Sequence, residues 1–188
     1  MAAEGVTVSE PLFAASFGQR NDAILAAWLG PSADARRVRR IGDAKEACFR
    51  RLVAAEGLAP LPGAVEWIER LSSGGWRQAI ASSAPRANVE ALVRALGVGG
   101  RLAVLVAAED VSAGKPDPEV FLVSAARLGV PPARAVVVED AAAGIEAARR
   151  AGMRSVGAGA AGLEASDVVV ASLADLPADT FDRLVPRA

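Results

Sequence analysis

The segment that most constrains the fold of this chain lies at residues 135–152. Residues 136–138 are three consecutive valines, which is typical of a strand buried on both faces of a parallel sheet. The run ends in two adjacent carboxylates, Glu139 and Asp140, and the helical pattern that follows them stops at Gly152. The segment therefore predicts a strand–helix unit with an acidic pair at the carboxyl end of the strand.

The acidic pair has two interpretations when it is taken alone. Open α/β sheets bind their ligands beyond the carboxyl ends of the strands, and adjacent carboxylates there suit Mg2+ with its waters. Alternatively, Asp140 caps the helix and Glu139 is merely solvated. The choice depends on what the other strands carry at the same edge of the sheet.

Composition limits the class of protein and its partners. With 188 residues, 52% of them hydrophobic and 4% aromatic, the chain can form one Ala/Val/Leu-packed domain with a small extension. Its net charge of −1 gives no basic field for nucleic acid. No apolar run has the length of a membrane span, and the N-terminus lacks a signal-peptide layout. We expect a cytoplasmic protein without nucleic-acid or membrane partners.

The scarcity of cysteine and histidine excludes several kinds of metal site and catalytic mechanism. Cys48 is the only cysteine, and the chain has no histidine. An internal disulfide and a cysteine-based zinc cluster are therefore excluded. Ser-His-Asp and Cys-His mechanisms are excluded as well.

The chain divides into a helical part and an alternating part. Residues 1–57 carry helical patterns at 10–17, 21–29 and 32–56, with Asn21 and Ser32 as expected caps and Gly42 as a candidate bend. A Pro/Gly-rich linker at 58–63 marks the expected domain boundary. The first part therefore predicts a helical subdomain.

Residues 58–188 alternate between strand and helix patterns. Strands are expected at 77–81, 103–106, 136–138, 155–157 and 168–170. Helices are expected at 65–71, 88–96, 118–128, after Asp140, and at about 178–184. This alternation predicts an α/β fold, a Rossmann-like parallel sheet with helices on both faces.

Two further polar segments follow predicted strands. Ser82 and Ser83 come after strand 77–81, where a hydroxyl and backbone N–H groups can hold a phosphate oxygen, although a simple turn is the alternative. Lys115 lies between Gly114 and two nearby prolines, where it can face a phosphate or a buried carboxylate, or be a surface lysine. A hydroxyl, a lysine and an acidic pair at one edge are a phosphoryl-transfer constellation.

A glycine-rich segment at 157–162 matches the dinucleotide fingerprint G-x-G-x-x-G. In that motif the last glycine opens a helix of a βαβ unit. Here the strand-like valines 168–170 begin too soon after Gly162 for such a helix. We therefore interpret this match as a false positive.

The chain resembles the haloacid dehalogenase superfamily, in particular its beta-phosphoglucomutase-like, phosphatase-rich branch with a helical cap. The segments that carry the resemblance are Leu61–Ala64, Ile80–Pro85, Gly114–Phe121 and Val138–Ala148. The resemblance implies that Ser82 binds phosphate and that Lys115 holds the phosphate and the nucleophile together. It also implies that Asp140 is a direct Mg2+ ligand, with Glu139 acting through a metal-bound water.

The helical part resembles the cap of this family. Within the segment 17–21, which begins with Phe17, Arg20 and Asn21 match cap positions that face the distal phosphate or polar groups of a substrate, and so does Lys45. Ser83 is a further candidate substrate-binding residue. The resemblance thus implies a small phosphorylated metabolite as substrate.

One departure from the family matters. In the family the first strand ends in Asp-x-Asp, which supplies the nucleophile and the general acid/base, and this sequence contains no Asp-x-Asp. The strand is central in the family's sheet, between the strands that end at Ser82 and Glu139, so its absence leaves two apolar edges. We expect the chain to be poorly soluble, closed across the gap, or oligomeric through these edges.

Three functional hypotheses follow. The favoured one is a phosphatase or sugar-phosphate mutase whose start codon was placed too late, so that the chain as given has little turnover; an in-frame Asp-x-Asp segment upstream of Met1 would support it. The second is a non-catalytic protein that binds a phosphorylated ligand or a partner. A haloacid dehalogenase is a weaker third, because the acidic pair fits a Mg2+ site better.

Overall fold

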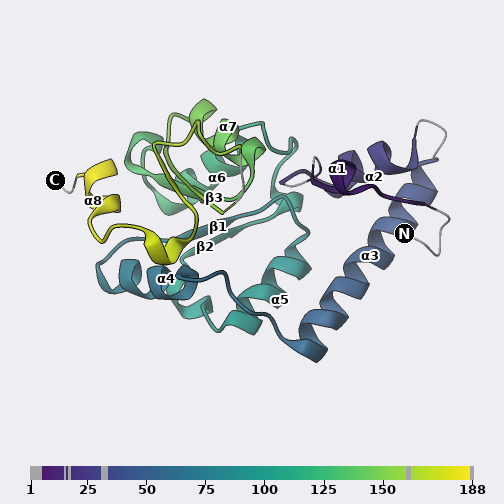
Figure 1. Cartoon of the computed structure of the whole chain (residues 1–188), viewed down its shortest axis with the longest axis horizontal. Coiled ribbons are helices and arrows are strands. Elements are labelled where there is room, and N and C mark those ends of the chain that lie inside the picture. Colours follow the sequence, from purple (N-terminus) through teal and green to yellow (C-terminus); the bar gives the residue numbers. More distant parts are fainter. Residues whose placement is uncertain (1–5, 15, 17, 31–33, 160–161, 187–188) are drawn as a thin grey trace.

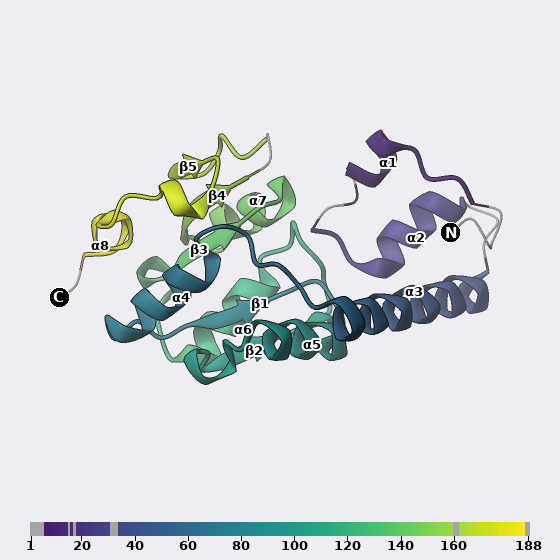
Figure 2. The ribbon, with the colours of Figure 1, turned by 60° about the horizontal axis from the view of Figure 1, so that its bottom comes forward.

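The computed structural model describes residues 6–14, 16, 18–30, 34–159 and 162–186. Its N-terminal helices extend to one side of an α/β core, and the two termini lie at opposite ends (Figure 1). The N-terminal helices are α1 (Glu10–Ala14), α2 (Asn21–Leu29) and α3 (Ala35–Glu56). Helix α3 ends beside α5 of the core, so that these two helices join the parts (Figure 2).

The helical part differs from the sequence expectations at its helix starts. Helix α1 ends at Ala14, short of the predicted residue 17. Asn21 is the first residue of α2 and not its cap, because its side-chain amide bonds to Glu46 instead. Asp34 caps α3 by accepting a hydrogen bond of 2.7 Å from the N–H of Arg37, and the predicted cap Ser32 lies outside the described residues.

Gly42 allows the close packing of α2 on α3. Helix α3 continues through this buried glycine as one helix. A Cβ at Gly42 would lie only 3.2 Å from Cδ1 of Leu25, the buried residue of α2. The glycine is therefore a contact point between the two helices.

The core alternates strands and helices as predicted. Its strands are β1 (Ala79–Ala81), β2 (Val104–Val106), β3 (Val136–Glu139), β4 (Arg154–Ala158) and β5 (Val168–Val170). Its helices are α4 (Ala64–Ser73), α5 (Arg86–Leu96), α6 (Glu119–Leu128), α7 (Ala142–Arg150) and α8 (Thr180–Leu184). Short 3-10 turns lie at η2 (Gly99–Arg101), η3 (Ala108–Asp110), η4 (Pro132–Arg134) and η5 (Leu173–Asp175).

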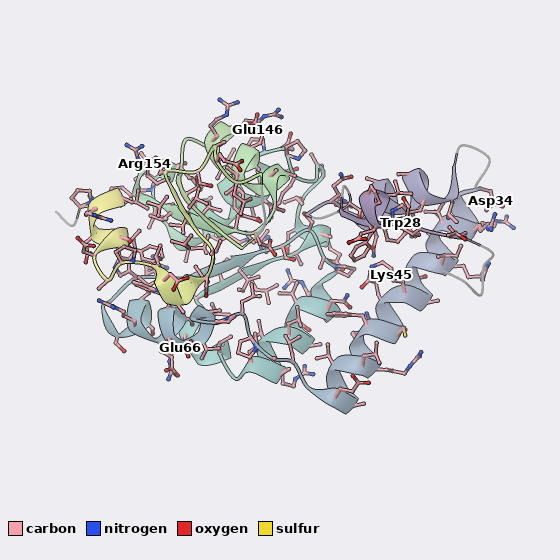
Figure 3. All side chains as sticks on the ribbon, in the orientation of Figure 1. Trp28, Asp34, Lys45, Glu66, Glu146 and Arg154 are labelled. Carbon is pink, nitrogen blue, oxygen red and sulfur yellow. The ribbon has the colours of Figure 1, made fainter. Side chains whose placement is uncertain are left out.

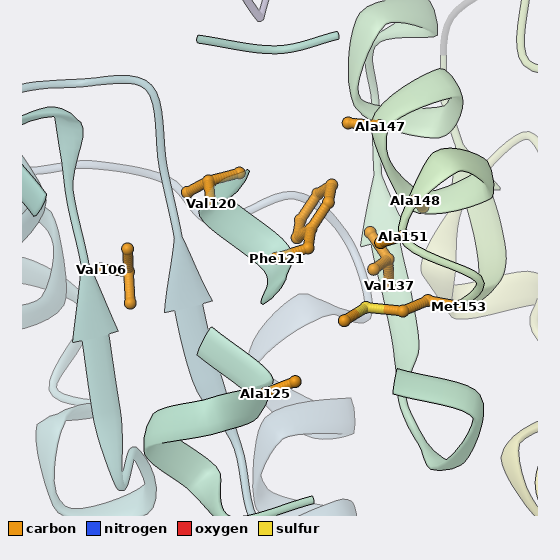
Figure 4. Close-up of a cluster of buried hydrophobic side chains, with 9 residues drawn as sticks. All are labelled: Val106, Val120, Phe121, Ala125, Val137, Ala147, Ala148, Ala151 and Met153. Carbon is orange, nitrogen blue, oxygen red and sulfur yellow. The ribbon is translucent and has the colours of Figure 1, made fainter. Parts of the chain in front are cut away.

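The strands form two separate parallel sheets, in the orders β1-β2 and β3-β4-β5. Closure across the gap, one of the three expected outcomes, is therefore not what the structure shows, because β1 and β3 do not pair. One apolar cluster spans both sheets. It joins Val106 of β2 and Val137 of β3 through residues of α6 and α7, among them Phe121 (Figure 4).

A second apolar cluster covers the opposite face of the three-stranded sheet. It contains Val156 of β4, Leu176 and Phe181, with Trp67 and Trp76 packed against it. Val136 contacts this cluster whereas its neighbour Val137 belongs to the first, as the alternation of side chains along a strand requires. Apolar clusters therefore lie on both faces of β3, but only Val137 of the three valines is buried, and Val138 is 42% exposed, so the predicted burial on both faces is only partly confirmed.

Two sequence-based exclusions can be compared with the structure. In the described part of the segment 157–167 no helix follows β4, so the dinucleotide fingerprint is indeed a false positive; residues 160 and 161 lie outside the description. Among the described helices, none is long and apolar enough to cross a membrane.

Candidate active site

The carboxyl ends of β1 and β3 line one cavity of about 540 Å³. Of the eight predicted site residues in the described part of the chain, all except Arg20 contribute to its lining: Asn21, Lys45, Ser82, Ser83, Lys115, Glu139 and Asp140. The Lys45 side chain lies on the side of α3 that is turned toward the core (Figure 3). Residues from the helical part and from the core thus meet at this edge, and the predicted residue Phe17 lies outside the described residues.

Lys115 is buried at the centre of this edge, with 9% of its surface exposed. Its ammonium group donates to the carboxylate of Glu139 and, at 3.3 Å, to the carbonyl oxygen of Ala81 at the end of β1. It also lies 4.8 Å from the centre of the Phe121 ring. Of the alternatives that the sequence left open for Lys115, the structure shows the buried carboxylate as its partner.

The Glu139 carboxylate depends on a glycine that the sequence analysis did not single out. It lies directly against Gly144 in the first turn of α7, where any Cβ would overlap it. Gly144 therefore allows Glu139 to reach Lys115. The only sequence signal for this role is the run of small residues at 141–144 that follows the acidic pair.

Asp140 is exposed and does not cap α7. The cap position is Ala141, and no side chain caps the helix there. Groups of three or more metal-binding side chains are absent from the described residues. A metal at this edge would take one or two carboxylates, from Asp140 and Glu139, and its other ligands from water or phosphate, which is how Mg2+ is often held.

Two polar groups of Ser82, its N–H and its Oγ, already form hydrogen bonds within the protein. Its N–H donates to the carbonyl of Val106 at 3.0 Å, which continues the β1–β2 ladder, so this N–H is not free for a phosphate. Its Oγ accepts from the N–H of Ala84 at 3.1 Å in a local turn, which leaves the hydroxyl proton to donate to a ligand. The N–H of Arg86, at the start of α5, is also occupied, because it donates to the carboxylate of Glu109.

Arg20 does not line the 540 Å³ cavity but contacts the loop after β2. Its Nη1 donates to the carbonyl oxygens of Ala108, at 3.2 Å, and Val111, at 3.0 Å. It also packs so closely on Gly114 that a Cβ there would overlap it. Arg20 lines a smaller neighbouring pocket with Lys115 and fastens the helical part to the loop after β2.

A polar cluster around Glu46 connects the helical part to the core. Glu46 is buried in α3 and accepts hydrogen bonds from Lys45, Asn21 and Asn88, the last of which lies in α5. Arg50 completes the cluster by donating to the side-chain oxygen of Asn88 at 2.7 Å. Glu46 and Asn88 line the cavity but were not singled out as site residues, because no local pattern in the sequence links them.

Electrostatics of this cluster predict a pH dependence. Burial raises the pKa of the Glu46 carboxyl, but the hydrogen bonds it accepts and the charge of Lys45 outweigh burial and leave the pKa below its ordinary value of 4.5. A lowered folded-state pKa means that ionised Glu46 stabilises the fold above pH 4.5. That contribution is lost as the pH falls through the folded-state pKa.

Replacing Glu46 with glutamine is expected to lower the free energy of unfolding at pH 7 by about 1–3 kcal/mol. The reason is that the donors Asn21, Lys45 and Asn88 would then bond to a neutral amide, which also carries hydrogens of its own, and no longer to a carboxylate. The variant is also expected to lose less stability than the parent as the pH falls below 4.5. Urea unfolding across this pH range measures both effects, with exposed Glu90→Gln in α5 as the control. Equal acid sensitivity of Glu46→Gln and the parent chain would contradict the role of Glu46.

Comparison with known proteins identifies the family. The family model for haloacid dehalogenase-like hydrolases matches residues 4–152. The chain belongs to this family. The predicted family is thereby confirmed.

This haloacid dehalogenase-like chain has phosphatases among its relatives. It is 38% identical over 130 residues to protein CbbY of Rhodobacter capsulatus, covering 68% of this chain and 56% of that protein. It is 39% identical over 114 residues to validoxylamine A 7'-phosphate phosphatase of Streptomyces hygroscopicus subsp. limoneus, covering 61% and 54%. The chain thus spans little more than half the length of these relatives.

Solved structures share the fold of this family member. CbbY from Rhodobacter sphaeroides in complex with xylulose-(1,5)bisphosphate has a TM-score of 0.83 at 28% identity, over 93% of this chain and 84% of that one. Beta-phosphoglucomutase from Clostridium difficile has a TM-score of 0.87 at 24% identity, over 97% of this chain and 84% of that one. The predicted α/β fold class is thereby confirmed.

Proposed function

We propose that the 540 Å³ cavity binds the phosphoryl group of a small phosphorylated sugar or polyol, with Mg2+ at Asp140 and Glu139. The observation that carries this proposal is the convergence of Ser82, Lys115 and the acidic pair on one cavity. A hydroxyl donor and a lysine suit phosphate oxygens, and the free carboxylate of Asp140 suits the metal. Mg2+ would supply charge neutralisation on the phosphate oxygens.

The substrate class follows from the other wall of the cavity. Asn21, Lys45 and Glu46 present an amide, an ammonium and a carboxylate, which are groups that hydrogen-bond hydroxyls and anionic oxygens. The relatives point the same way, because they include a validoxylamine A 7'-phosphate phosphatase and a phosphorylated carbohydrates phosphatase of Thermotoga maritima. We therefore place the sugar or polyol part of the ligand against these residues.

We expect this chain alone to bind its ligand with little or no turnover. Phosphoryl transfer in this family is expected to need a carboxylate nucleophile, and the sequence contains no Asp-x-Asp. Glu139, the carboxylate nearest Lys115, is already held by that lysine. Haloacid dehalogenase activity would also lack the carboxylate nucleophile that it needs.

Calorimetric titration of the full chain with xylulose-(1,5)bisphosphate and with inorganic phosphate, each with and without Mg2+, tests the proposal. We expect the bisphosphate to bind more tightly than phosphate, because it also reaches the polar groups of the helical part. Asp140→Asn should abolish the gain in affinity that Mg2+ gives, whereas Asp179→Asn, an exposed control beside α8, should not.

Two outcomes would count against the proposed function. Failure of both ligands to bind would remove the phosphate site. Rapid Mg2+-dependent release of phosphate from the bisphosphate would overturn the expectation of little turnover, and it would point to another nucleophile.

A further inference from the structure

Each lysine in the 540 Å³ cavity is bonded to a glutamate. The charged side chains of the lining, all of which belongs to the described part of the chain, are Lys45, Lys115, Glu46, Glu139 and Asp140. Lys115 donates to Glu139, and Lys45 donates to Glu46. Both cationic side chains of this lining therefore already have a carboxylate partner.

The two ends of the cavity differ in the positive charge that they can provide. At the Lys115 end, Asp140 is exposed and would hold Mg2+ beside one phosphate group. At the other end, Glu46 is buried and accepts hydrogen bonds at both of its oxygens, from Lys45 and from two asparagines. The carboxylate of Glu46 is thus occupied and does not offer a second place for a cation. Positive charge for a phosphate is therefore available at the Lys115 end only.

Two arginines close to the cavity are engaged elsewhere. Arg20 donates to the carbonyl oxygens of Ala108 and Val111. Arg50 donates to the side-chain oxygen of Asn88 at 2.7 Å. Neither arginine lines the cavity. A second anionic group in the cavity would therefore not meet an arginine.

Apolar side chains accompany the polar groups of the helical wall. Three helices each carry, one turn after a polar residue of the lining, an apolar one that also lines the cavity: Ile24 in α2, Phe49 in α3 and Leu92 in α5. Helix α3 packs against both α2 and α5. An ion beside apolar surface loses hydration, whereas the carbon skeleton of a sugar or polyol gains by contacting it. This wall therefore favours an uncharged ligand group.

The Lys45–Glu46 pair adds to this preference. The Glu46 side chain is 9% exposed, and its carboxyl is ionised at neutral pH because its pKa lies below the ordinary value of 4.5. An anion that took Lys45 would leave this charge buried with amide donors only, and the two negative charges would repel each other. A hydroxyl meets no such penalty, because it can accept from another hydrogen of the Lys45 ammonium while the pair stays intact.

We propose that this site selects phosphate monoesters whose organic part is uncharged, and that Glu46 is the specificity-determining residue that disfavours a second phosphate group. The inference rests on the proposed function, because it requires one phosphoryl group to bind beside Lys115. It narrows the substrate class from phosphorylated sugars and polyols in general to their monophosphates. Hydroxyls of the organic part bond to Asn21 and Lys45, and its carbon surface contacts the apolar side chains of the helical wall.

Calorimetric titration of the full chain with fructose 6-phosphate and fructose 1,6-bisphosphate tests this inference, because the two ligands differ by one phosphate group. Both titrations are made at the same free Mg2+ concentration, with inorganic phosphate as the reference. We expect both esters to bind more tightly than inorganic phosphate. The monophosphate should bind about tenfold more tightly than the bisphosphate, because the second phosphate is placed beside the charge of Glu46.

Variants of α3 assign the preference to Glu46. Glu46→Gln should reduce the preference for the monophosphate by about tenfold, because Lys45 then has no carboxylate partner and can bind the second phosphate. Adding Lys45→Met to this variant should restore much of the preference, since the released cation is then absent. Asp43→Asn is the matched control, because Asp43 is exposed on the same helix and does not line the cavity; it should leave the preference within about twofold.

The readout is a ratio of two affinities measured on one variant, so a loss of folded protein affects both affinities equally. Equal affinity of the parent chain for the two esters, each above that for phosphate, would overturn the inference and leave the proposed function intact. A preference in Glu46→Gln equal to that of the parent would overturn the role of Glu46. Failure of both esters to bind would be a failure of the proposed function, and this inference would fall with it.

Discussion

Replacing Gly63 with alanine is expected to lower the free energy of unfolding by about 3–4 kcal/mol, as measured by urea denaturation. Gly63 is the residue that precedes and caps α4, and its φ of +83° is a left-handed conformation that disfavours a side chain. A Cβ there would also overlap the main chain of Leu173 and Ala174 in η5. The linker would have to move away from η5, which strains the nearby hydrogen bond of 2.8 Å from Trp67 to the carbonyl of Leu173.

Gly75→Ala is the matched control for this prediction. Gly75 has φ of +79°, yet a Cβ at this glycine would have no atom within 4 Å. Its alanine variant should lose only the backbone term, about 1–2 kcal/mol. The difference between the two variants then measures the overlap with η5, and equal losses would refute it.

The second large effect is expected at Lys115. Replacing Lys115 with methionine should lower the free energy of unfolding by about 3–5 kcal/mol at pH 7, because it leaves the Glu139 carboxylate buried without its partner. The two side chains are only 6% and 8% exposed. Adding Glu139→Gln to this variant should recover much of the loss, since no unpaired charge then remains.

An exposed ion pair provides the comparison. Arg154 contacts Asp167 at 2.8 Å, but the Arg154 side chain is 59% exposed. Arg154→Met should therefore cost about 1 kcal/mol or less. If Lys115→Met cost no more than Arg154→Met in urea denaturation, the buried pair would not be a major source of stability.

The structure also changes how the edge of the sheet is understood. Lys115 and Glu139 form a buried ion pair, and Arg20 is bound to the loop after β2. These three side chains therefore already have hydrogen-bond or ion-pair partners within the protein. A phosphate that binds here must compete with Glu139 for Lys115, whereas Asp140 remains available to a cation.

Local patterns in the sequence were sufficient for most helices and strands and for placing Ser82, Lys115 and the acidic pair at one edge of the sheet, whereas Asn21 and Lys45 came from the resemblance to the family. The valine runs marked β3 and β5 because consecutive β-branched residues favour the strand conformation, although Val138 and Val169 are still 42% and 49% exposed. Polar residues that directly follow such runs, such as Ser82 and the acidic pair, had to lie at one edge once the strands were parallel. These inferences need only the neighbours of each residue along the chain.

The tertiary structure alone decided which groups are partners and which edges stay open. The Lys115–Glu139 pair joins residues 24 positions apart, and the Glu46–Asn88 bond joins residues 42 positions apart, so no periodicity connects them. Gly144 matters only because the Glu139 side chain folds back onto it. The resemblance to the family predicted a gap between the strands that end at Ser82 and Glu139, but only the structure shows that α6 packs on β1 and β2 while α7 packs on β3 and β4, and that β1 and β3 do not pair.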